Sequence, residues 1–513
     1  MQPASRAVPR GSFYLVLQGA VQYAAYFLAY VVLTRILNPS EIGELPLLAA
    51  TYSVFSTVTL FSIGTATTKY VAQYAGSGNR NKVAGVASTA VRIVAALSVP
   101  SFLIVTLVSR QVSELIFGTA LNPAVLVLVI FAAVILNFGT ILLAVLWGLN
   151  LFGQMVTANI VGVITSRVLG VLLATSPLRL EGYFIGWIIG NISTILIAVL
   201  YARPHLSKTK EKMPVMAMLV YSYPILFSSL VGLVQQWADV TILYGLTGSL
   251  VYTGVYYLGL AGSNILSPIA IALTSAVFPT LSSKHGRAEP ESFRSTLLVA
   301  ERAMNVLVIP ASFGLAAIAP TAVSVAYGRN YLAATIPFAI LVASTILVAY
   351  QSLMATVLQS IARTQPLLQI ASVAAVTEVI LTAALVGPLN VTGSAIARLG
   401  MVLVSLLVTD WYVRGEWWSS PDKQQLLKCL ALSGVIAAAL FVFSSYFLSK
   451  LAINPPGKLL LDAGVFAIVY IGGLVILKPL DQEDIDLLKS AIPSRLHWPL
   501  RMLERQIIRS EQL

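Results

Sequence analysis

Residues 121–148, LNPAVLVLVIFAAVILNFGTILLAVLWG, form an apolar stretch without a single charged side chain. A stretch of this length matches the roughly 20 helical residues that cross the hydrocarbon core of a bilayer. Because backbone amides in lipid must be hydrogen-bonded within their own segment, the stretch should form a transmembrane helix. It therefore decides the fold class.

Outward from this stretch, about fourteen apolar runs of roughly 18–28 residues fill the chain between Phe13 and Leu477. Short polar connectors separate them. The predicted helices are 13–34, 45–67, 83–108, 121–148, 156–174, 183–201, 215–245, 251–278, 295–318, 331–358, 365–386, 389–413, 426–448 and 459–477. We predict an all-α polytopic membrane protein with about fourteen transmembrane helices.

The composition agrees with this class. Apolar residues make up 58% of the 513 residues and charged residues 10%, against roughly 25% charged residues in a soluble domain. Lys and Arg number 32 and Asp and Glu 20, a net charge of +12. In a membrane protein such a basic excess marks cytoplasmic loops, so we expect no nucleic-acid partner.

Loop charges orient the chain. With a cytoplasmic N-terminus, the predicted helices leave 16 Lys and Arg residues on the inner side and 6 on the outer side. The positive-inside rule requires this bias. The first run follows Arg6 and Arg10 but is too long for a signal peptide, so we expect it to be a retained helix. The sequence predicts a multi-pass protein of the cell (plasma) membrane with both termini in the cytoplasm. We expect it to be a monomer.

The sequence lacks several groups that catalysis or metal binding needs. Cys429 is the only cysteine, which excludes an internal disulfide and a Cys/His zinc cluster. No G-x4-G-K-[ST] motif is present, so the chain does not hydrolyse ATP through a P-loop. The predicted outer loops are too short to shape an acceptor site. We expect no enzyme activity, no cofactor and no metal.

The chain also repeats itself. Four residues recur at an offset of 210: Gly76, Arg92, Pro100 and Gly118 correspond to Gly286, Arg302, Pro310 and Gly328. The repeat relates six predicted helices to the next six. Because six is an even number, both halves enter the membrane from the same side, which predicts a parallel repeat about an axis along the membrane normal.

The repeat predicts the domain organisation. We expect an N-terminal lobe at 1–205 (helices 1–6), a C-terminal lobe at 206–415 (helices 7–12), and an added helix pair at 416–478. In the tail at 479–513, Leu and Ile residues share one helical face and Arg residues lie on others. This pattern suits a cytoplasmic amphipathic helix on the membrane surface, the alternative being a solvated tail.

Charges inside predicted helices are the candidate functional groups, because each is costly in lipid unless it has a partner, water or a role. Glu378 and Arg398 each lie ten residues from Pro388 in a predicted outer turn, so an antiparallel hairpin places them level, about 15 Å below the turn. Asp239 has a similar depth. One interpretation is a Glu378–Arg398 ion pair that only neutralises both charges. The other is that Asp239 and Glu378 bind a coupling proton or sodium ion, with Thr392 or Ser394 as neutral oxygen ligands.

Three arginines are candidates for holding an anionic substrate. Arg92 and Arg302 occupy matching positions near cytoplasmic helix ends, where a long side chain can either reach back to the headgroups or face a cavity. Arg167 lies deeper, with no obvious acid at its level in the first lobe. A guanidinium binds phosphate through two hydrogen bonds, so a cavity-facing arginine would suit an anionic substrate.

Glycines at 182, 186 and 190 fall on one face of a predicted helix. Small residues at this spacing let two helix backbones approach closely in a membrane. The pattern predicts tight helix packing and no chemistry.

A family resemblance rests on motifs in both lobes. After Gly11-Ser12 the first lobe carries an L-x-R-x-L-x-P-x-E-x-G turn, made of Leu33, Arg35, Leu37, Pro39, Glu41 and Gly43. The second has Tyr223-Pro224, Asp239, Phe278-Pro279, Pro310 and Tyr327-Gly328 in order. The chain resembles the polysaccharide (oligosaccharide) flippases of the multidrug/oligosaccharidyl-lipid/polysaccharide exporter superfamily over its first twelve helices.

The resemblance implies a two-lobed transporter that works by alternating access and is coupled to an ion gradient. Its cargo would be an oligosaccharide on a polyprenyl phosphate or diphosphate, moved from the inner to the outer leaflet among membrane lipids. Some flippase relatives carry arginines in the cavity-lining helices, whereas helices 1, 2, 7 and 8 here have none at mid-depth. Recognition of substrate charge would then fall to Arg92, Arg167, Arg302 or Lys69.

Two other functions stay open at this point. A cation-coupled exporter of small amphipathic molecules, of the multidrug type, would share the fold and differ in cargo. An integral-membrane glycosyltransferase or glycan polymerase would share the hydropathy, but such enzymes generally carry a catalytic acid in an enlarged external loop.

Overall fold

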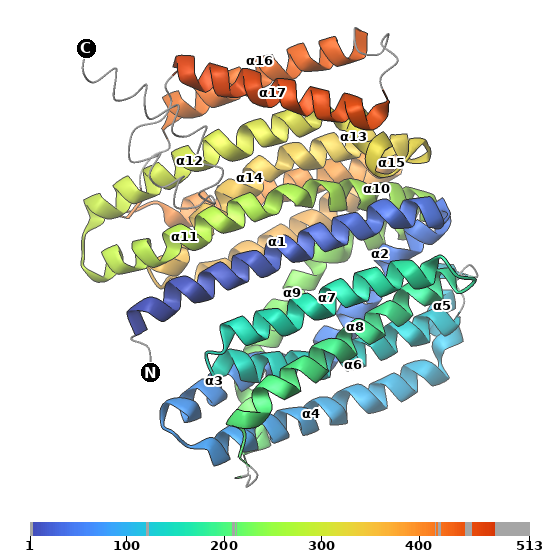
Figure 1. The fold of residues 1–513 in the computed structure, drawn as a ribbon, viewed down its shortest axis with the longest axis vertical. Helices are drawn as coiled ribbons and strands as arrows, with labels where there is room; N and C mark the ends of the chain where they lie inside the picture. Colours follow the sequence, from blue (N-terminus) through green and yellow to red (C-terminus); the bar gives the residue numbers. More distant parts are fainter. Residues whose placement is uncertain are drawn as a thin grey trace. The chain divides into compact units, whose positions relative to one another are not determined.

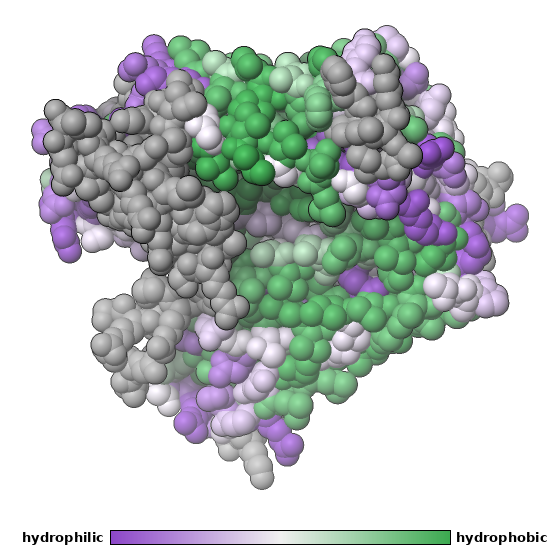
Figure 2. All heavy atoms as spheres, turned by 45° about the horizontal axis from the view of Figure 1, so that its top comes forward, coloured by the Kyte–Doolittle hydropathy of each residue, from purple (hydrophilic) through white to green (hydrophobic). Residues whose placement is uncertain are grey.

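The computed structural model describes residues 4–118, 123–207, 211, 213–415, 417–418, 422–446 and 454–477. These residues form α-helices and short 3-10 turns, with no β-strand in the described ranges (Figure 1). Broad areas of the visible surface are apolar, and hydrophilic residues gather toward its margins (Figure 2). The all-α membrane class predicted from the sequence is confirmed.

The helices of the first half are α1 (Ala4–Ile36), α2 (Pro39–Leu60), α3 (Ile63–Gly76), α4 (Arg80–Leu107), α5 (Ser109–Phe117), α6 (Pro123–Gly148), α7 (Phe152–Ala174), α8 (Arg179–Ala202), the 3-10 turn η2 (Arg203–His205) and α9 (Val215–Thr247). Between α2 and α3 the chain bends by 46°. Phe61 and Ser62 both take left-handed backbone angles there, with φ of 51° and 54°, and this divides the predicted helix 45–67.

The remaining helices are α10 (Leu250–Ser263), η3 (Asn264–Leu266), α11 (Ser267–Gly286), α12 (Pro290–Ala317), α13 (Ala319–Ala326), η4 (Arg329–Ala334), α14 (Thr335–Ser360), α15 (Gln365–Val413), α16 (Lys423–Tyr446) and α17 (Pro455–Leu477). Helices α16 and α17 lie side by side (Figure 1).

Helix α15 is a hairpin of two helices. Its 49 residues would extend about 74 Å as one straight helix, more than twice the roughly 30 Å of a bilayer core. Asn390 interrupts it with φ 48° and ψ −125°. A side-chain carbon at Gly393 would overlap the carbonyl group of Leu385, so the chain folds back closely at this point.

The number of membrane spans agrees with this division. Within the described residues, 12 helices are long and apolar enough to cross a membrane, or 13 if α2 and α3 together form one bent span. Dividing α15 at Asn390 adds one more and gives the predicted fourteen.

The helix bounds repeat at the offset found in the sequence. Helix α4 covers Arg80–Leu107 and α12 covers Pro290–Ala317, 28 residues each and 210 positions apart. Helices α3 and α11 likewise end at Gly76 and Gly286. The residue pairs that indicated the repeat therefore lie on corresponding elements.

The chain forms two compact units, Met1–Gly254 and Val255–Leu513. Helix α9, the first helix after the predicted boundary at 205/206, packs against α2, α3 and α4 in the first unit. The lobes at 1–205 and 206–415 stay a prediction from the repeat. Helices α16 and α17 supply the predicted pair at 416–478, and the predicted tail helix at 479–513 lies outside the described residues.

The core of the first unit contains a buried polar cluster. Asn137 of α6 is fully buried. Its side-chain oxygen accepts a hydrogen bond from Ser56 at 2.5 Å, and its nitrogen donates to Thr59 at 2.8 Å and to Ser98 at 3.2 Å. One amide thus joins α2, α4 and α6, and its hydrogen bonds offset the cost of burying polar groups.

The core of the second unit is built mainly of α11, α12, α14, α16 and α17. Its fully buried side chains include Leu281, Phe293, Ile309 and Val357. Phe466 and Tyr470 of α17 belong to the same cluster, so the last helix pair shares the core of this unit.

Candidate functional site

A polar hollow of about 240 Å³ lies within the first unit, between α1, α2, α6, α7 and α8. Arg167 of α7 lines it and is only 7% exposed. The other walls are aromatic rings, carboxamides and hydroxyl groups. The sequence predicted a deep cavity-facing arginine as one of two options, and the structure places Arg167 on a cavity wall.

Aromatic side chains surround the Arg167 guanidinium. Its central carbon lies 3.8 Å from the ring centre of Tyr26 and 4.6 Å from that of Trp187. One terminal nitrogen donates a 2.5 Å hydrogen bond to the hydroxyl of Tyr183. Cation–π contacts of this kind recover part of the energy lost when a cation leaves water. No ion pair of Arg167 occurs among the described residues.

Three polar atoms on the walls of this hollow are buried without a hydrogen-bond partner in the described part of the chain. They are Nε of Arg167, Nε1 of Trp187 and Oδ1 of Asn159. Buried polar groups are nearly always paired in native proteins, so such orphaned groups at a cavity indicate a place for water or a ligand.

A wider hollow of about 650 Å³ adjoins the first and shares Thr140, Leu143 and Asn159 with it. Lys69 of α3 lines this hollow. Its ammonium nitrogen lies 3.9 Å from the ring centre of Tyr221 on α9. The first unit therefore contains two adjoining hollows, each lined by one cationic side chain.

Arg92 and Arg302 occupy the same position in α4 and α12, twelve residues after the first residue of each helix, and both have polar partners. Arg92 is exposed on α4 and donates to the Ser88 carbonyl at 3.3 Å and the Thr89 hydroxyl at 3.0 Å. Arg302 of α12 forms an ion pair with Asp422 at 2.8 Å. Arg92 thus turns back along α4, whereas Arg302 contacts the segment that precedes α16.

The Arg302–Asp422 pair belongs to a network that fixes α16 to α12. The Gln425 amide donates to the Arg302 carbonyl at 3.1 Å and accepts from Asn305 at 2.8 Å. The backbone N–H of Gln425 donates to Asp422 and lowers the pKa of that carboxyl below its ordinary value, and the Arg302 guanidinium lowers this pKa further.

Glu378 and Arg398 form the predicted pair across the α15 hairpin. Their nearest side-chain oxygen and nitrogen are 3.7 Å apart, with Glu378 fully buried and the Arg398 side chain 20% exposed. Ser394, one turn before Arg398, is fully buried, and its hydroxyl has no hydrogen-bond partner among the described residues. Thr392 is half-buried.

Thr382 completes this group and was missed by the sequence analysis. It lies one turn after Glu378 on the same face of the helix, is fully buried, and its hydroxyl likewise has no hydrogen-bond partner in the described chain. The i,i+4 spacing from a membrane-embedded carboxylate was the signal that could have found it.

Asp239, the other predicted carboxylate, lies on α9 in the first unit and is fully buried. Its Oδ1 accepts a 2.7 Å hydrogen bond from the backbone N–H of Val240. Asp239 and Glu378 thus belong to different compact units, and their sharing one ion site stays a prediction.

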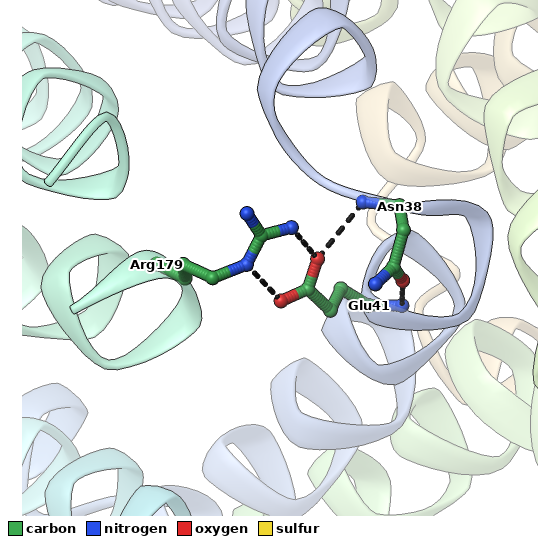
Figure 3. A network of polar contacts seen from close by, with 3 residues as sticks. All are labelled: Asn38, Glu41 and Arg179. Carbon is green, nitrogen blue, oxygen red and sulfur yellow. Dashed lines mark hydrogen bonds and ion pairs between the residues drawn. The ribbon is translucent and has the colours of Figure 1, made fainter. Parts of the chain in front are cut away.

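The glutamate of the L-x-R-x-L-x-P-x-E-x-G turn has a structural role in the first unit (Figure 3). Glu41 accepts a 2.8 Å hydrogen bond from the backbone N–H of Asn38, while Asn38 accepts one from the backbone of Glu41 at 3.0 Å. These two bonds form a capping box at the start of α2. Both Glu41 oxygens also accept from Arg179 at the start of α8, the Nε contact at 2.6 Å.

The glycine face of α8 holds the wall of the deep hollow in place. A side-chain carbon at Gly186 would overlap the backbone of Gly170, and one at Gly190 would overlap Ser166. The predicted close packing is confirmed. It sets Arg167 on α7 against Tyr183 and Trp187 on α8, but the sequence analysis did not identify these two aromatic partners or Tyr26, since they come from other helices.

These features define a polytopic helical membrane protein with a transporter fold and a cationic hollow inside its first unit. A family model described as "Polysaccharide biosynthesis protein" matches residues 8–285, more than half of the chain. The chain belongs to this family of polysaccharide biosynthesis proteins.

Individual relatives are more distant. The chain is 23% identical over 293 residues to the probable low-salt glycan biosynthesis flippase Agl15 of Haloferax volcanii, a match that covers 57% of this chain and 62% of that protein. The chain thus spans less than two thirds of this curated relative.

Solved structures identify the fold. The lipid II flippase MurJ in an inward closed conformation superimposes with a TM-score of 0.64 at 14% identity, covering 92% of this chain and 98% of that chain. An inward-facing multidrug resistance MATE family transporter of the MOP superfamily has a TM-score of 0.66 at 14% identity, covering 76% and 94%. The fold is that of these transporters.

Proposed function

We propose that the protein is a flippase that moves a polyprenyl-(di)phosphate-linked oligosaccharide from the inner to the outer leaflet by alternating access. The observation that carries this proposal is the pair of adjoining hollows in the first unit, one lined by Arg167 and the other by Lys69, with no ion pair of either cation among the described residues. An embedded cationic hollow suits an anionic, sugar-bearing lipid, because cations in the membrane interior are costly unless they serve a ligand.

Family and fold support the same function. Membership of the polysaccharide biosynthesis family connects the chain with glycan assembly. The relative in Haloferax volcanii is described as a probable low-salt glycan biosynthesis flippase, and a structural neighbour that covers 92% of this chain is a lipid II flippase.

The four predicted substrate contacts divide into two pairs. Arg167 and Lys69 line hollows and are proposed to attract the negative charges of the substrate. Arg92 and Arg302, whose partners lie on α4 and just before α16, are proposed to act at the entry side, where the carrier's phosphates lie among the headgroups.

We further propose ion coupling in the second unit. Glu378 would bind a proton or sodium ion, with the hydroxyls of Ser394 and Thr392 as neutral ligands and Arg398 as the charge that competes with the ion. Asp239 is proposed as a second coupling carboxylate in the first unit. The buried, unpaired hydroxyl of Ser394 supports the site in α15.

The proposal includes location and assembly. The bias of basic residues toward one side supports cytoplasmic termini and a plasma-membrane location. The protein is proposed to act as a monomer among membrane lipids, as a transporter rather than an enzyme, without nucleic acid.

A cation-coupled exporter of small amphipathic molecules is the second candidate. The likeness to the MATE family transporter favours it, since the TM-score of 0.66 is as high as that to the flippase. This candidate predicts transport of a soluble dye or drug, with no lipid-linked glycan required.

Reconstitution into liposomes tests the proposal. A fluorescent polyprenyl-diphosphate oligosaccharide is placed in the inner leaflet, a proton or sodium gradient is imposed, and accessibility to an external lectin is followed. We expect wild type to exceed empty liposomes by at least about tenfold in rate, equivalent to roughly 1.4 kcal/mol of barrier. Asp239→Asn and Arg167→Ala should be slower at matched protein amounts, and the surface variant Arg110→Gln should match wild type.

The alternative outcomes are informative. If wild type flips no lipid-linked glycan under either gradient but extrudes an amphipathic dye, the exporter replaces the flippase. Equal flipping by wild type, Asp239→Asn and Arg167→Ala would support the flippase function. It would also show that Asp239 and Arg167 have structural roles only.

A further inference from the structure

The deep hollow of the first unit combines three kinds of wall that together suit a sugar. Tyr26, Tyr52 and Trp187 present aromatic rings, and Gln22 and Asn159 present carboxamides. The apolar C–H face of a pyranose packs against an aromatic ring, and carboxamides can both donate to and accept from sugar hydroxyls. A phosphate alone has no apolar face that could pack against the aromatic walls.

The size of the hollow limits the ligand. Its volume of about 240 Å³ lies just below the roughly 300–1,000 Å³ of typical small-molecule sites. The hollow therefore suits one sugar residue and not an oligosaccharide. The wider hollow of about 650 Å³, which shares Asn159 with it, leaves room for the rest of a chain.

The charge of the hollow selects an anion. Arg167 is 93% buried, has no ion pair among the described residues, and its Nε has no hydrogen-bond partner there. A buried cation without an opposite charge is costly, and the rings of Tyr26 and Trp187 offset only part of this cost. A ligand with one negative charge would complete the neutralisation.

The position of Arg167 favours a carboxylate over the carrier's phosphates. Arg167 lies fifteen residues after the start of α7 at Phe152 and seven before its end at Ala174, about 22 Å and 10 Å along the helix. Before each crossing the carrier's phosphates lie among the headgroups, whereas the sugar end of the substrate can already extend into the protein. One guanidinium also matches the single charge of a carboxylate, which it can bind through two hydrogen bonds.

We propose that this hollow binds one acidic sugar residue, a uronic acid, of the transported glycan, with Arg167 on its carboxylate and Asn159 on its hydroxyls. The proposal rests on the proposed flippase function and specifies the substrate class. According to this proposal, the first unit selects glycans by their charge.

Two substrates that differ only in this group test the proposal. Polyprenyl-diphosphate disaccharides ending in glucuronate or in glucose are flipped in the same liposome assay by wild type, Arg167→Gln, Asn159→Ala and the surface control Arg110→Gln. We expect wild type and Arg110→Gln to flip the glucuronate substrate faster. Arg167→Gln should lose about tenfold or more on glucuronate and little on glucose, since one charge-assisted contact is removed. Asn159→Ala should slow both substrates.

The glucose substrate controls for folding, because a misfolded variant would lose both rates. Equal losses on the two substrates in folded Arg167→Gln, checked by an unchanged elution volume and a cooperative melting transition above the assay temperature, would overturn the proposal and leave Arg167 a structural residue. The same rate of wild type on both substrates would also overturn it. Failure to flip either one would contradict the flippase function itself.

A binding measurement separates the sugar from the phosphate and does not depend on flipping. Free glucuronate, glucose and inorganic phosphate are titrated into wild-type protein in nanodiscs while tryptophan fluorescence is followed, because Trp187 lines the hollow. We expect a saturable change with glucuronate that Arg167→Gln loses and Arg110→Gln keeps. Saturation by phosphate at equal or lower concentration would assign the hollow to a phosphate and overturn the sugar proposal.

Discussion

The hollow around Arg167 and the hairpin of α15 deal with a buried charge in opposite ways. In α15, Glu378 and Arg398 lie 3.7 Å apart, so each charge has its opposite on the same hairpin. In the first unit, Arg167 has aromatic rings and one tyrosine hydroxyl, with no carboxylate partner in the described chain. In α15 the opposite charge belongs to the hairpin itself, so an ion that binds Glu378 has to compete with Arg398. Beside the hollow, the opposite charge for Arg167 can come from a ligand.

The largest expected effect comes from the packing that holds Arg167 beside its aromatic partners. Gly186→Ala places a methyl group into the backbone of Gly170, which cannot move independently, so we expect a loss of stability of about 3 kcal/mol or more. Thermal unfolding in detergent measures it. The matched control is Gly232→Ala in α9, where a methyl group meets nothing within 4 Å. Equal stability of the two variants would contradict the close α7–α8 contact.

The next effect concerns the Glu378–Arg398 ion pair, in contrast to Arg167, which has no ion pair among the described residues. Glu378→Gln leaves Arg398 without its counter-charge, and we expect a destabilisation of about 3 kcal/mol, at the low end for a buried pair because Arg398 is partly exposed. The double variant Glu378→Gln/Arg398→Gln should recover at least half of this loss. Denaturant unfolding in mixed micelles gives both values. No recovery in the double variant would show that the pair does not act as a unit.

A smaller effect is expected at Arg167 itself. Arg167→Gln removes a cation–π contact and one hydrogen bond but leaves no carboxylate unpaired, so the expected loss is about 1–2 kcal/mol. The same unfolding assay applies. A loss as large as that of Glu378→Gln would remove the contrast between the two regions.

The smallest effect concerns the Arg302–Asp422 ion pair of the second unit. The pKa of Asp422 is lowered in the folded protein, so its contribution to stability is present above the unfolded pKa of about 3.9 and is lost as pH falls through the lower folded value. Wild type should exceed Asp422→Asn by about 0.5–1 kcal/mol at pH 7, and the two should converge as the pH falls below the folded pKa of Asp422. Melting curves across this range test the sign. A difference that grows on acidification would contradict the assignment.

The sequence predicted whatever depends on one hairpin or one helix face. The level positions of Glu378 and Arg398 follow from a rise of 1.5 Å per residue, and the glycine face of α8 follows from its period. Contacts between distant segments could not be predicted this way. Asp422 lies 120 residues after Arg302, and the aromatic partners of Arg167, which lies on α7, come from α1 and α8. Such contacts depend on how helices rotate about their axes, which a single sequence does not specify.

Asn137 has a consequence for movement inside the first unit. Its carboxamide bonds Ser56, Thr59 and Ser98 at once, on two neighbouring helices. Sliding α6 by one turn, about 5.4 Å, would separate every one of these partners, at about 1–3 kcal/mol for each buried group left unpaired. The amide therefore locks the register of α2, α4 and α6, and the helix displacements of a transport cycle are expected to arise outside this triplet.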